Sequence, residues 1–512
     1  MSSWSLLLPR DIRTQISSYL DQNNKYYPVI DNQMYLIKYI AKKNDTNNDV
    51  KYMKYLQVLD CSIYSIYSNF TDKGIKHLTN LQKLHCGRNT NFTDEGIKHL
   101  TNLQELNCGH NNNFTDEGLK YLTNLQKLFC EENTKFTDEG LKYLTNLQVL
   151  HCGYNNRNFT DEGIKQLTNL QVLHCGYNNR NFTDEGIKHL INLQILTCGH
   201  NNNLTDKGIK YLINLQELNC WFNNTNFTDE GLKHLINLQK LTCGNNNNFT
   251  DKGLKHLTNL QELNSGHNNN FTDEGIKYLT NLQILECNKN FTDEGIKYLN
   301  NLQKLHCWFN INFTDKGLKR LSSLHKLNCG RNTNFTDEGL KHLSNLQELD
   351  CMYNNNFTDK GIKQLINLQV LNCGYNTDNF TDEGLKHLTN LQELDCSKNT
   401  NFTDKGLCYL INLQKLHCCG WLLKTLISKF TNKGLSYLNN LQVLDCGANT
   451  NFTDEGLKNL SNLQELNCRY NTNFTDKGLS YLNNLQKLSC GKNINFTDEQ
   501  LKHLTILNIN YF

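Results

Sequence analysis

Cysteine is the most reactive side chain that recurs along this chain, which contains 21 cysteines in 512 residues. All of them except Cys408 and Cys419 occupy one position of a repeated sequence, from Cys61 to Cys490, and Ser265 replaces cysteine once at that position. Thiolates can bind soft metals or act as nucleophiles. No Cys-x-x-Cys pair or convergent histidine spacing accompanies these cysteines, so the sequence predicts no metal site and no cofactor.

The regular spacing of the cysteines also argues against disulfides. In a stack of parallel strands, residues at the same position lie about 4.8 Å apart and their Cα–Cβ bonds point in the same direction. A disulfide needs Cβ atoms about 3.8 Å apart and a dihedral angle near 90°. We therefore expect a ladder of buried thiols that behave as small apolar side chains.

Histidine and acidic residues recur without a pattern typical of catalysis. One position of the predicted strands holds histidine in several repeats: His85, His151, His174, His306 and His417. His151 and His174 fall in neighbouring repeats, but two imidazoles without a third ligand make a poor zinc site. The acids of Thr-Asp-Glu-Gly recur in many repeats, which suits helix capping better than acid–base catalysis. The known catalytic motifs are absent too, so the sequence predicts that the protein is not an enzyme.

Aromatic residues at the predicted strand ends are the stronger candidates for function. Trp221-Phe222 and Trp308-Phe309 begin where most repeats have glycine. Exposed Trp and Tyr are enriched in interface hot spots, although these side chains could instead pack sideways over neighbouring loops. The candidate partner-binding residues are Phe129, Tyr154, Tyr177, Trp221, Phe222, Trp308, Phe309, Tyr353, Tyr375 and Trp421.

A repeat of about 22 or 23 residues positions these side chains, with the sequence Leu-Gln-x-Leu-x-Cys-x-x-Asn followed by Phe-Thr-Asp-x-Gly-Leu-Lys-x-Leu-x-Asn. In the repeat that begins at Leu103, the alternation of Leu106 and Cys108 predicts a short strand. Asn111 predicts a turn, with its side chain bonded to the adjacent turn. Thr115 is a good N-cap for a short helix. Each repeat is thus expected to be one coil of strand, turn and helix.

About twenty such repeats predict an α/β solenoid with a parallel sheet on the concave face and short helices on the convex face. We expect residues 51–512 to form this solenoid, with an irregular insertion at 418–429. Residues 1–50 are expected to form a separate small helical segment. Residues 148–165 recur without change as 171–188, which indicates tandem duplication.

The Leu-x-x-Leu-x-Cys-x-x-Asn half of the unit resembles the core of leucine-rich repeats. The Phe-Thr-Asp-x-Gly-Leu half is similar to the helical part of the cysteine-containing class of these repeats. The resemblance covers roughly residues 51–512 and implies a curved parallel sheet, with protein binding as the usual function. The present units are shorter than the roughly 26 residues of that class, so its curvature is not carried over.

The segment before the repeats contains both prolines, Pro9 and Pro28. Its sequence from Leu8-Pro9 through an aliphatic pair four residues apart to Tyr19-Leu20-Asp21 resembles the first half of an F-box. The resemblance implies docking on the adaptor of a cullin-type ubiquitin ligase through Leu8, Pro9, Ile12, Ile16, Tyr19 and Leu20. The Val-x-x-x-Trp ending of that motif is missing, and the alternative is a helical cap on the apolar end of the solenoid.

Charge and hydropathy exclude several other classes of protein. The net charge of +2 argues against nucleic acid and anionic membranes as partners. No apolar run approaches the roughly 18 residues that span a bilayer, and no signal peptide is evident. We expect a cytoplasmic location, with the nucleus as an alternative and a host cell if the protein is viral.

The resemblances imply a protein–protein interaction function, with the target on the concave face or the rim. The finer expectation is a substrate receptor of a cullin-type, SCF-like ubiquitin ligase, in which the N-terminal helices dock the adaptor and the solenoid selects the target. The alternative is a stand-alone binding scaffold or host-interaction protein whose N-terminal segment is only a cap.

Overall fold

The computed structural model divides the chain into two compact units, Met1–Phe249 and Thr250–Phe512. Each unit is described by itself. The residues that the structure describes are 29–30, 33–34, 38–40, 45–50, 53, 55–62, 70–154, 158–177, 181–222, 226–375, 379–420, 428–491, 495–497 and 508–510.

Short parallel strands and one-turn helices alternate through the first unit. Its strands, each paired in parallel with the next, are β3 (Lys38–Ile40), β4 (Val58–Asp60), β5 (Lys83–His85), β6 (Glu105–Asn107), β7 (Lys127–Phe129), β8 (Val149–His151), β9 (Val172–His174), β10 (Ile195–Thr197), β11 (Glu217–Asn219) and β12 (Lys240–Thr242). Its helices are α2 (Asn47–Val50), α3 (Asp72–Ile75), α4 (Asp94–Ile97), α5 (Asp116–Leu119), α6 (Asp138–Leu141), α7 (Asp161–Ile164), α8 (Asp184–Ile187), α9 (Asp206–Ile209) and α10 (Asp229–Leu232).

The second unit has the same alternation of elements. Its parallel strands are β13 (Glu262–Asn264), β14 (Ile284–Glu286), β15 (Lys304–His306), β16 (Lys326–Asn328), β17 (Glu348–Asp350), β18 (Val370–Asn372), β19 (Glu393–Asp395), β20 (Lys415–His417), β21 (Val443–Asp445), β22 (Glu465–Asn467), β23 (Lys487–Ser489) and β24 (Asn508–Asn510). Its helices are α11 (Asp251–Leu254), α12 (Asp273–Ile276), α13 (Asp293–Ile296), α14 (Asp315–Leu318), α15 (Asp337–Leu340), α16 (Asp359–Ile362), α17 (Asp382–Leu385), α18 (Asp404–Leu407), α19 (Asn432–Leu435), α20 (Asp454–Leu457) and α21 (Asp476–Leu479).

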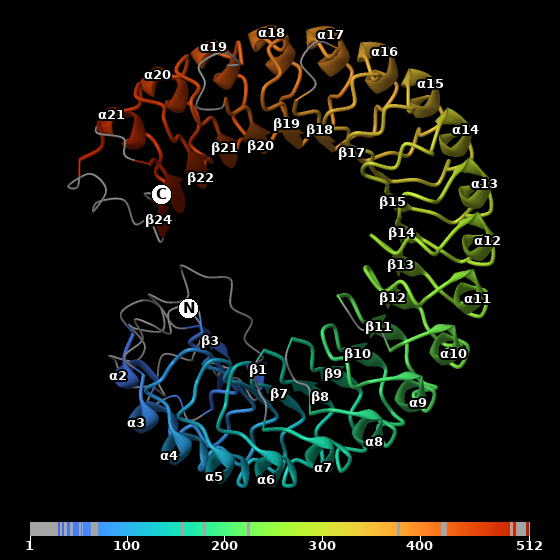
Figure 1. Ribbon diagram of the computed structural model, residues 1–512. Helices are drawn as coiled ribbons and strands as arrows, with labels where there is room; N and C mark the ends of the chain where they lie inside the picture. The colour runs from blue at the N-terminus through green and yellow to red at the C-terminus, as the bar shows by residue number, and fades with distance from the viewer. Residues whose placement is uncertain are drawn as a thin grey trace. The chain divides into compact units, whose positions relative to one another are not determined.

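Within each unit the strands line the inner side and the helices lie on the outer side (Figure 1). The register places identical repeat positions opposite one another, as in the pairing of Leu196 with Leu218. The apolar repeat positions are fully buried between the sheet and the helices, as in the repeat at Leu103, Leu106, Cys108, Phe114 and Leu119. The predicted α/β solenoid of parallel strands and short helices is therefore confirmed.

The cysteines of the repeat form the predicted ladder of free thiols. They are buried except for the half-buried Cys287. Several of these thiols donate to a backbone carbonyl of the next strand, as where Cys130 Sγ donates to the carbonyl oxygen of His151 at 3.4 Å. Burial raises the pKa of Cys175 to about 12, so this thiol stays protonated and unreactive at neutral pH.

The predicted bond from the asparagine side chain to the adjacent turn is confirmed as well, and its recurrence from repeat to repeat forms an asparagine ladder. The buried Asn111 donates from Nδ2 to the carbonyl oxygen of Asn89, at 2.6 Å, in the preceding repeat. Its Oδ1 accepts the backbone N–H of Asn113 in its own repeat. The two positions where the sequence breaks this ladder, Tyr64 and Trp421, lie outside the described residues.

The threonine N-caps are tied to the preceding repeat by an aspartate. Thr115 caps α5 by accepting the backbone N–H of Glu117, as predicted. Its own N–H and hydroxyl donate to Asp94 Oδ1 and Oδ2, at 2.9 and 2.6 Å. The aspartate therefore clamps two consecutive repeats together, a role beyond the helix capping that the sequence indicated. A Cβ at Gly118 would lie 2.4 Å from Asp94 Oδ1, which explains the glycine of the repeat.

Where asparagine replaces this aspartate, the direction of one hydrogen bond reverses. Asn432 Nδ2 donates to Thr453 Oγ1 at 2.8 Å, and Asn47 Nδ2 donates to Thr71 Oγ1 at 2.9 Å. Neither Thr453 nor Thr71 then forms a side-chain cap bond with its own helix. The carboxylate is thus the acceptor that leaves the threonine oxygen available for capping.

The parallel sheet of the first unit begins inside the segment 1–50. Strand β3 pairs with β4, and the buried Tyr39 of β3 donates to Asp45 Oδ2 at 2.6 Å. Ahead of it, β1 (Val29–Ile30) and β2 (Gln33–Met34) pair antiparallel. The adaptor-binding residues predicted between Leu8 and Leu20 lie outside the described residues, and the separate cap stays a prediction.

Only the two ends of the predicted insertion 418–429 are described, and Trp421 is not among the described residues. Lys429 forms a parallel bridge with Thr403. The buried Ser428 accepts from Asn449 Nδ2 at 2.8 Å, so a serine hydroxyl serves as the ladder acceptor at this point.

Candidate binding surfaces

In most of the described repeats, the turn after the strand holds one residue in a left-handed backbone conformation. Tyr177, Phe222 and Arg331 have φ angles of 60°, 60° and 59°. This conformation costs a residue other than glycine about 1–2 kcal/mol. Backbone hydrogen bonds hold the turn in place, as where Tyr177 N donates to Gly199 O at 2.9 Å. Because consecutive turns share one conformation, side chains at this position project in parallel and stack.

In the first unit this position builds a continuous stack of rings, which we call the aromatic row: Tyr154, Tyr177, His200 and Phe222. The ring centroids of Tyr154 and Tyr177 lie 4.5 Å apart with the planes 8° from parallel. Those of Tyr177 and His200 are 4.8 Å apart, and those of His200 and Phe222 are 5.3 Å apart. Trp221 stacks on Phe222 at 4.7 Å. One end of the row is thereby broadened by an indole.

In the second unit the same position builds a row of rings and cations, which we call the mixed row: Phe309, Arg331, Tyr353, Tyr375 and Lys398. The Arg331 guanidinium carbon lies 4.8 Å from the Phe309 centroid and 4.5 Å from that of Tyr353. Tyr353 stacks on Tyr375 at 4.4 Å, and Lys398 Nζ lies 4.3 Å from the Tyr375 ring. The ring centroids of Trp308 and Phe309 are 5.9 Å apart.

Residues of both rows remain accessible although they pack on one another. Tyr154 and Tyr177 are 47% and 40% exposed, and Phe309 is 58% exposed. Sideways packing and exposure, which the sequence left as alternatives, therefore occur together. The rings form rigid surfaces whose edges face solvent.

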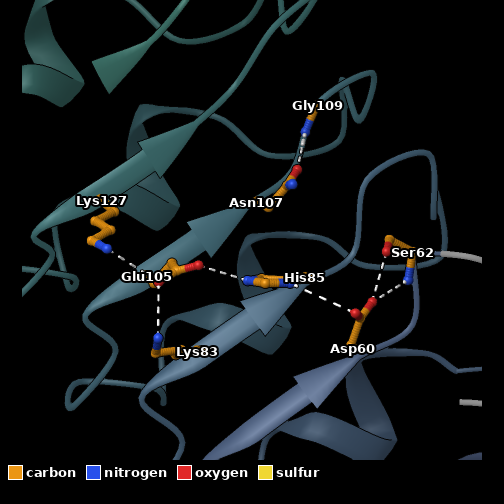
Figure 2. A network of polar contacts seen from close by, with 8 residues as sticks. All are labelled: Asp60, Ser62, Lys83, His85, Glu105, Asn107, Gly109 and Lys127. Atoms are coloured by element: carbon orange, nitrogen blue, oxygen red, sulfur yellow. Dashed lines mark hydrogen bonds and ion pairs between the residues drawn. The ribbon is translucent and has the colours of Figure 1, made fainter. Parts of the chain in front are cut away.

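The inner face of the first unit carries a chain of charges across β4, β5 and β6 (Figure 2). His85 Nε2 lies 2.8 Å from Glu105 Oε1, and His85 Nδ1 lies 3.8 Å from Asp60 Oδ2. Lys83 and Lys127 approach Glu105 Oε2 from either side, at 3.3 and 4.0 Å. The neighbouring His85 imidazole lowers the pKa of Asp60 to about 2, and the Asp60 carboxylate in turn raises the pKa of His85. Each charged side chain at this end of the face therefore lies within 4.0 Å of a side chain of opposite charge.

The next strands along the sheet carry stacked rings instead. The rings of Phe129 and His151 lie 4.5 Å apart, and those of His151 and His174 lie 3.9 Å apart. Burial, with a smaller contribution from His151, lowers the pKa of His174 to about 4, so that imidazole is neutral at physiological pH. His151 Nδ1 lies 3.4 Å from Glu131. Across the part of the chain that the structure describes, no three His, Cys, Asp or Glu side chains gather to hold a metal.

The structure groups most of the sequence-predicted residues. Phe129 lies on the inner face of the sheet, whereas Tyr154, Tyr177 and Phe222 form the aromatic row and Phe309, Tyr353 and Tyr375 belong to the mixed row. The two tryptophans, Trp221 and Trp308, flank the rows.

Sequence reasoning missed three members of the rows: His200, Arg331 and Lys398. The search for aromatic side chains passed over them. Their common repeat position, the second residue after the cysteine position, was the signal that could have found them.

Parts of the chain are similar to leucine-rich-repeat proteins. A family model described as Leucine Rich repeat matches residues 99–122 and 256–279. A leucine-rich-repeat protein of Leptospira interrogans is 24% identical with a TM-score of 0.44, and the match covers 72% of this chain and 91% of that one. The plant peptide hormone receptor RGFR1 in complex with RGF2 is 18% identical with a TM-score of 0.36, over 92% of this chain and 88% of that one. No curated protein matches the chain.

The fold is a solenoid of parallel strands and short helices, and its functional candidates are surfaces on its turns and inner faces. A bilayer-spanning helix, which needs length and apolar composition together, does not occur in the part of the chain that the structure describes.

Proposed function

We propose that this protein is an interaction scaffold that binds another protein through the side chains at its strand ends, with the aromatic row as a principal contact surface. The observation that carries the proposal is the row itself, in which Tyr154, Tyr177, His200 and Phe222 stack in four successive repeats while remaining accessible. Tyr and Trp supply large contact areas with few rotatable bonds.

The stacking lowers the cost of binding. A flexible side chain that is immobilised in an interface costs about 0.5–1.5 kcal/mol, and rings already held by their neighbours avoid much of that cost. The backbone bond from His200 N to Phe222 O, at 3.0 Å, fixes the turn beneath the rings. The row is therefore a preorganised surface.

The test compares captured proteins between matched variants of the full chain. Tyr177→Asn removes a ring of the row, and asparagine already occupies the same left-handed position at Asn245. Tyr143→Asn is the control, because Tyr143 is 38% exposed next to helix α6 and outside the row. We expect chemical cross-linking in extracts to recover a partner with wild type and Tyr143→Asn but not with Tyr177→Asn. Equal recovery by both variants would contradict the proposal.

The finer proposal is that residues 8–20 dock the adaptor of a cullin-type ubiquitin ligase in the cytoplasm, so that the solenoid presents a target for ubiquitination. Its support is the Leu8-Pro9 sequence with Ile12 and Ile16 at helical spacing. Without an adaptor, the protein acts as a stand-alone scaffold or host-interaction protein.

The adaptor proposal needs point variants, because a deletion that reaches β3 would remove the buried Tyr39 from the sheet. In a binding assay with purified adaptor, Ile12→Asp and Ile16→Asp are expected to abolish retention of the full chain. Tyr177→Asn is expected to leave retention unchanged. Retention of both aspartate variants at the wild-type level would refute the docking role.

A further inference from the structure

Arg331 is held between two ring faces at the surface of the second unit. Its guanidinium carbon lies 4.8 Å from the Phe309 ring and 4.5 Å from the Tyr353 ring. The backbone of Arg331 is fixed by its N–H bond to Met352 O at 2.9 Å. Stacking on both faces leaves the edge of the guanidinium, where its N–H donors point, as the part open to solvent.

No carboxylate among the described residues neutralises this guanidinium, although lysines of the neighbouring strands do find acids. Lys326 of β16 pairs with Glu348 and Lys415 of β20 pairs with Glu393, the latter at 2.9 Å. Arg331 is exposed and forms no ion pair in the described part of the chain. Two parallel N–H groups of a guanidinium match the two oxygens of a carboxylate.

We propose that the mixed row binds an acidic segment of a partner protein, in which a carboxylate pairs with Arg331 and an adjacent apolar or aromatic side chain packs beside Phe309 and Trp308. This rests on the proposed scaffold function and names the kind of partner that one of its surfaces takes. Lys398, 4.3 Å from the Tyr375 ring, adds a second positive charge further along the row. Trp, Tyr and Arg are the residue types most enriched in binding hot spots.

A peptide segment fits this row better than a nucleic acid does. Binding a phosphate backbone relies on many cations along its path, whereas the mixed row offers one arginine and one lysine. Asp350 and Asp395 lie at the ends of β17 and β19, three residues before Tyr353 and Lys398. These acids oppose an extended polyanion but leave room for an isolated carboxylate at Arg331.

The experiment measures fluorescence anisotropy of a labelled peptide of repeated Glu-Gly-Phe triplets with the full-length protein. We expect saturable binding, and no binding of the same peptide with glutamine in place of glutamate. Arg331→Gln should weaken binding about tenfold, because it removes a charge-assisted bidentate contact. Arg331→Lys, which keeps the charge but loses the planar fork, should weaken it less.

The matched control is Arg88→Gln. Arg88 is an exposed arginine in the same left-handed position of the first unit, with φ of 63°, and no aromatic ring stacks on it among the described residues. Wild-type affinity is expected for Arg88→Gln, and circular dichroism should show all variants folded.

The proposal would be overturned by equal loss of binding in Arg88→Gln and Arg331→Gln, by equal binding of the glutamine peptide, by tighter binding of polyuridylate than of the acidic peptide, or by no binding of the acidic peptide. If the acidic peptide fails while Tyr177→Asn still abolishes partner capture, only this inference falls and the scaffold function stands.

Discussion

The aromatic row of the first unit and the mixed row of the second unit occupy the same repeat position and share one backbone conformation, yet they differ in charge. The first row contains Tyr154, Tyr177, His200 and Phe222. In the second row, an arginine stands between two rings and a lysine approaches a third. The difference teaches that the repeat separates stability from recognition, because the buried positions stay nearly constant while exposed positions such as this one vary.

The inner faces of the two units differ in the same manner. His174 in the first unit stacks on the imidazole of His151, and its pKa is lowered to about 4, mainly because the ring is buried. His417 Nδ1 in the second unit lies 3.8 Å from Asp445 Oδ2, and this neighbouring carboxylate raises the pKa of His417. Equivalent strand positions therefore hold histidines whose pKa values are shifted in opposite directions, downward at His174 and upward at His417.

If the two units share one scaffold, replacing the equivalent buried glycine by alanine should lower the free energy of unfolding by a similar amount in each unit. A Cβ at Gly118 or Gly339 would lie 2.4 Å from Asp94 Oδ1 or Asp315 Oδ1. We expect Gly118→Ala and Gly339→Ala each to lower the free energy of unfolding by about 1–3 kcal/mol, measured by urea denaturation. Gly266→Ala is the control, because its nearest contact would be 3.5 Å away. Tolerance of alanine at one of the two positions would break the comparison.

Substitutions at the aspartate clamp should have a smaller effect on stability, destabilising at Asp94 in the first unit and stabilising at Asn432 in the second. Asp94→Asn should reproduce the arrangement at Asn47, remove the cap bond of Thr115 and cost about 1 kcal/mol. Asn432→Asp should restore the cap of Thr453 and add a similar amount. Glu95→Gln, at an exposed neighbour of Asp94, serves as the control. Thermal unfolding that changes in the same direction for both clamp variants would rule out the clamp as the cause.

The contributions of His174 and His417 to the stability of their two units should depend on pH in opposite ways. The folded-state pKa of His174 is lowered, so the stability that depends on its neutral form is lost as the pH falls from 6.5 toward 4. The folded-state pKa of His417 is raised, so its contribution to stability is complete below pH 6.5 and is lost as the pH rises from 6.5 through the raised pKa.

Histidine NMR titrations are expected to place the midpoint of His174 near pH 4 and that of His417 above 6.5. His174→Asn should reduce acid sensitivity, whereas His417→Asn should lower stability at pH 6 more than at pH 9. Asparagine already occupies this strand position at Asn107. Indistinguishable midpoints for the two histidines would refute the contrast between the inner faces.

The smallest effect is expected for the rows themselves. Tyr177→Asn and Arg331→Asn should each change the free energy of unfolding by less than about 1 kcal/mol, because exposed stacking contributes little and asparagine tolerates the left-handed turn. Urea denaturation of the two variants measures this. A loss of several kcal/mol in either unit would make that row part of the scaffold rather than a recognition surface.

Most of the fold followed from the sequence because each buried repeat position has its own physical requirement. Leu106 and Cys108 alternate as a strand requires, Asn111 suits a turn, and Thr115 suits a helix cap. The carboxylate of Asp94 could not be assigned to Thr115 in this way, since a contact between repeats is invisible when one repeat is read alone. The parallel sheet entering the segment 1–50 at β3 was missed because those residues lack the repeat pattern.

The candidate surfaces followed less completely. Aromatic types alone pointed to Tyr177 and Phe309, but their stacking partners His200 and Arg331 depend on the shared left-handed turn. The lowered pKa of His174 depends on burial and on the 3.9 Å separation from His151. Such properties require atomic positions, which the spacing of residues in sequence does not supply.

A repeat that carries the aspartate clamp contains both halves of the contact between repeats: its threonine binds the aspartate of the preceding repeat, and its aspartate binds the threonine of the next one. The same contact recurs at 2.8 Å where Thr160 N donates to Asp138 Oδ1 and where Thr183 N donates to Asp161 Oδ1. Residues 148–165 and 171–188 are identical, and a copied repeat of this kind arrives with both halves of its joint already matched. The chain can therefore lengthen by whole repeats without any new interface having to evolve, and each added repeat brings one more exposed position on which a new specificity can be built.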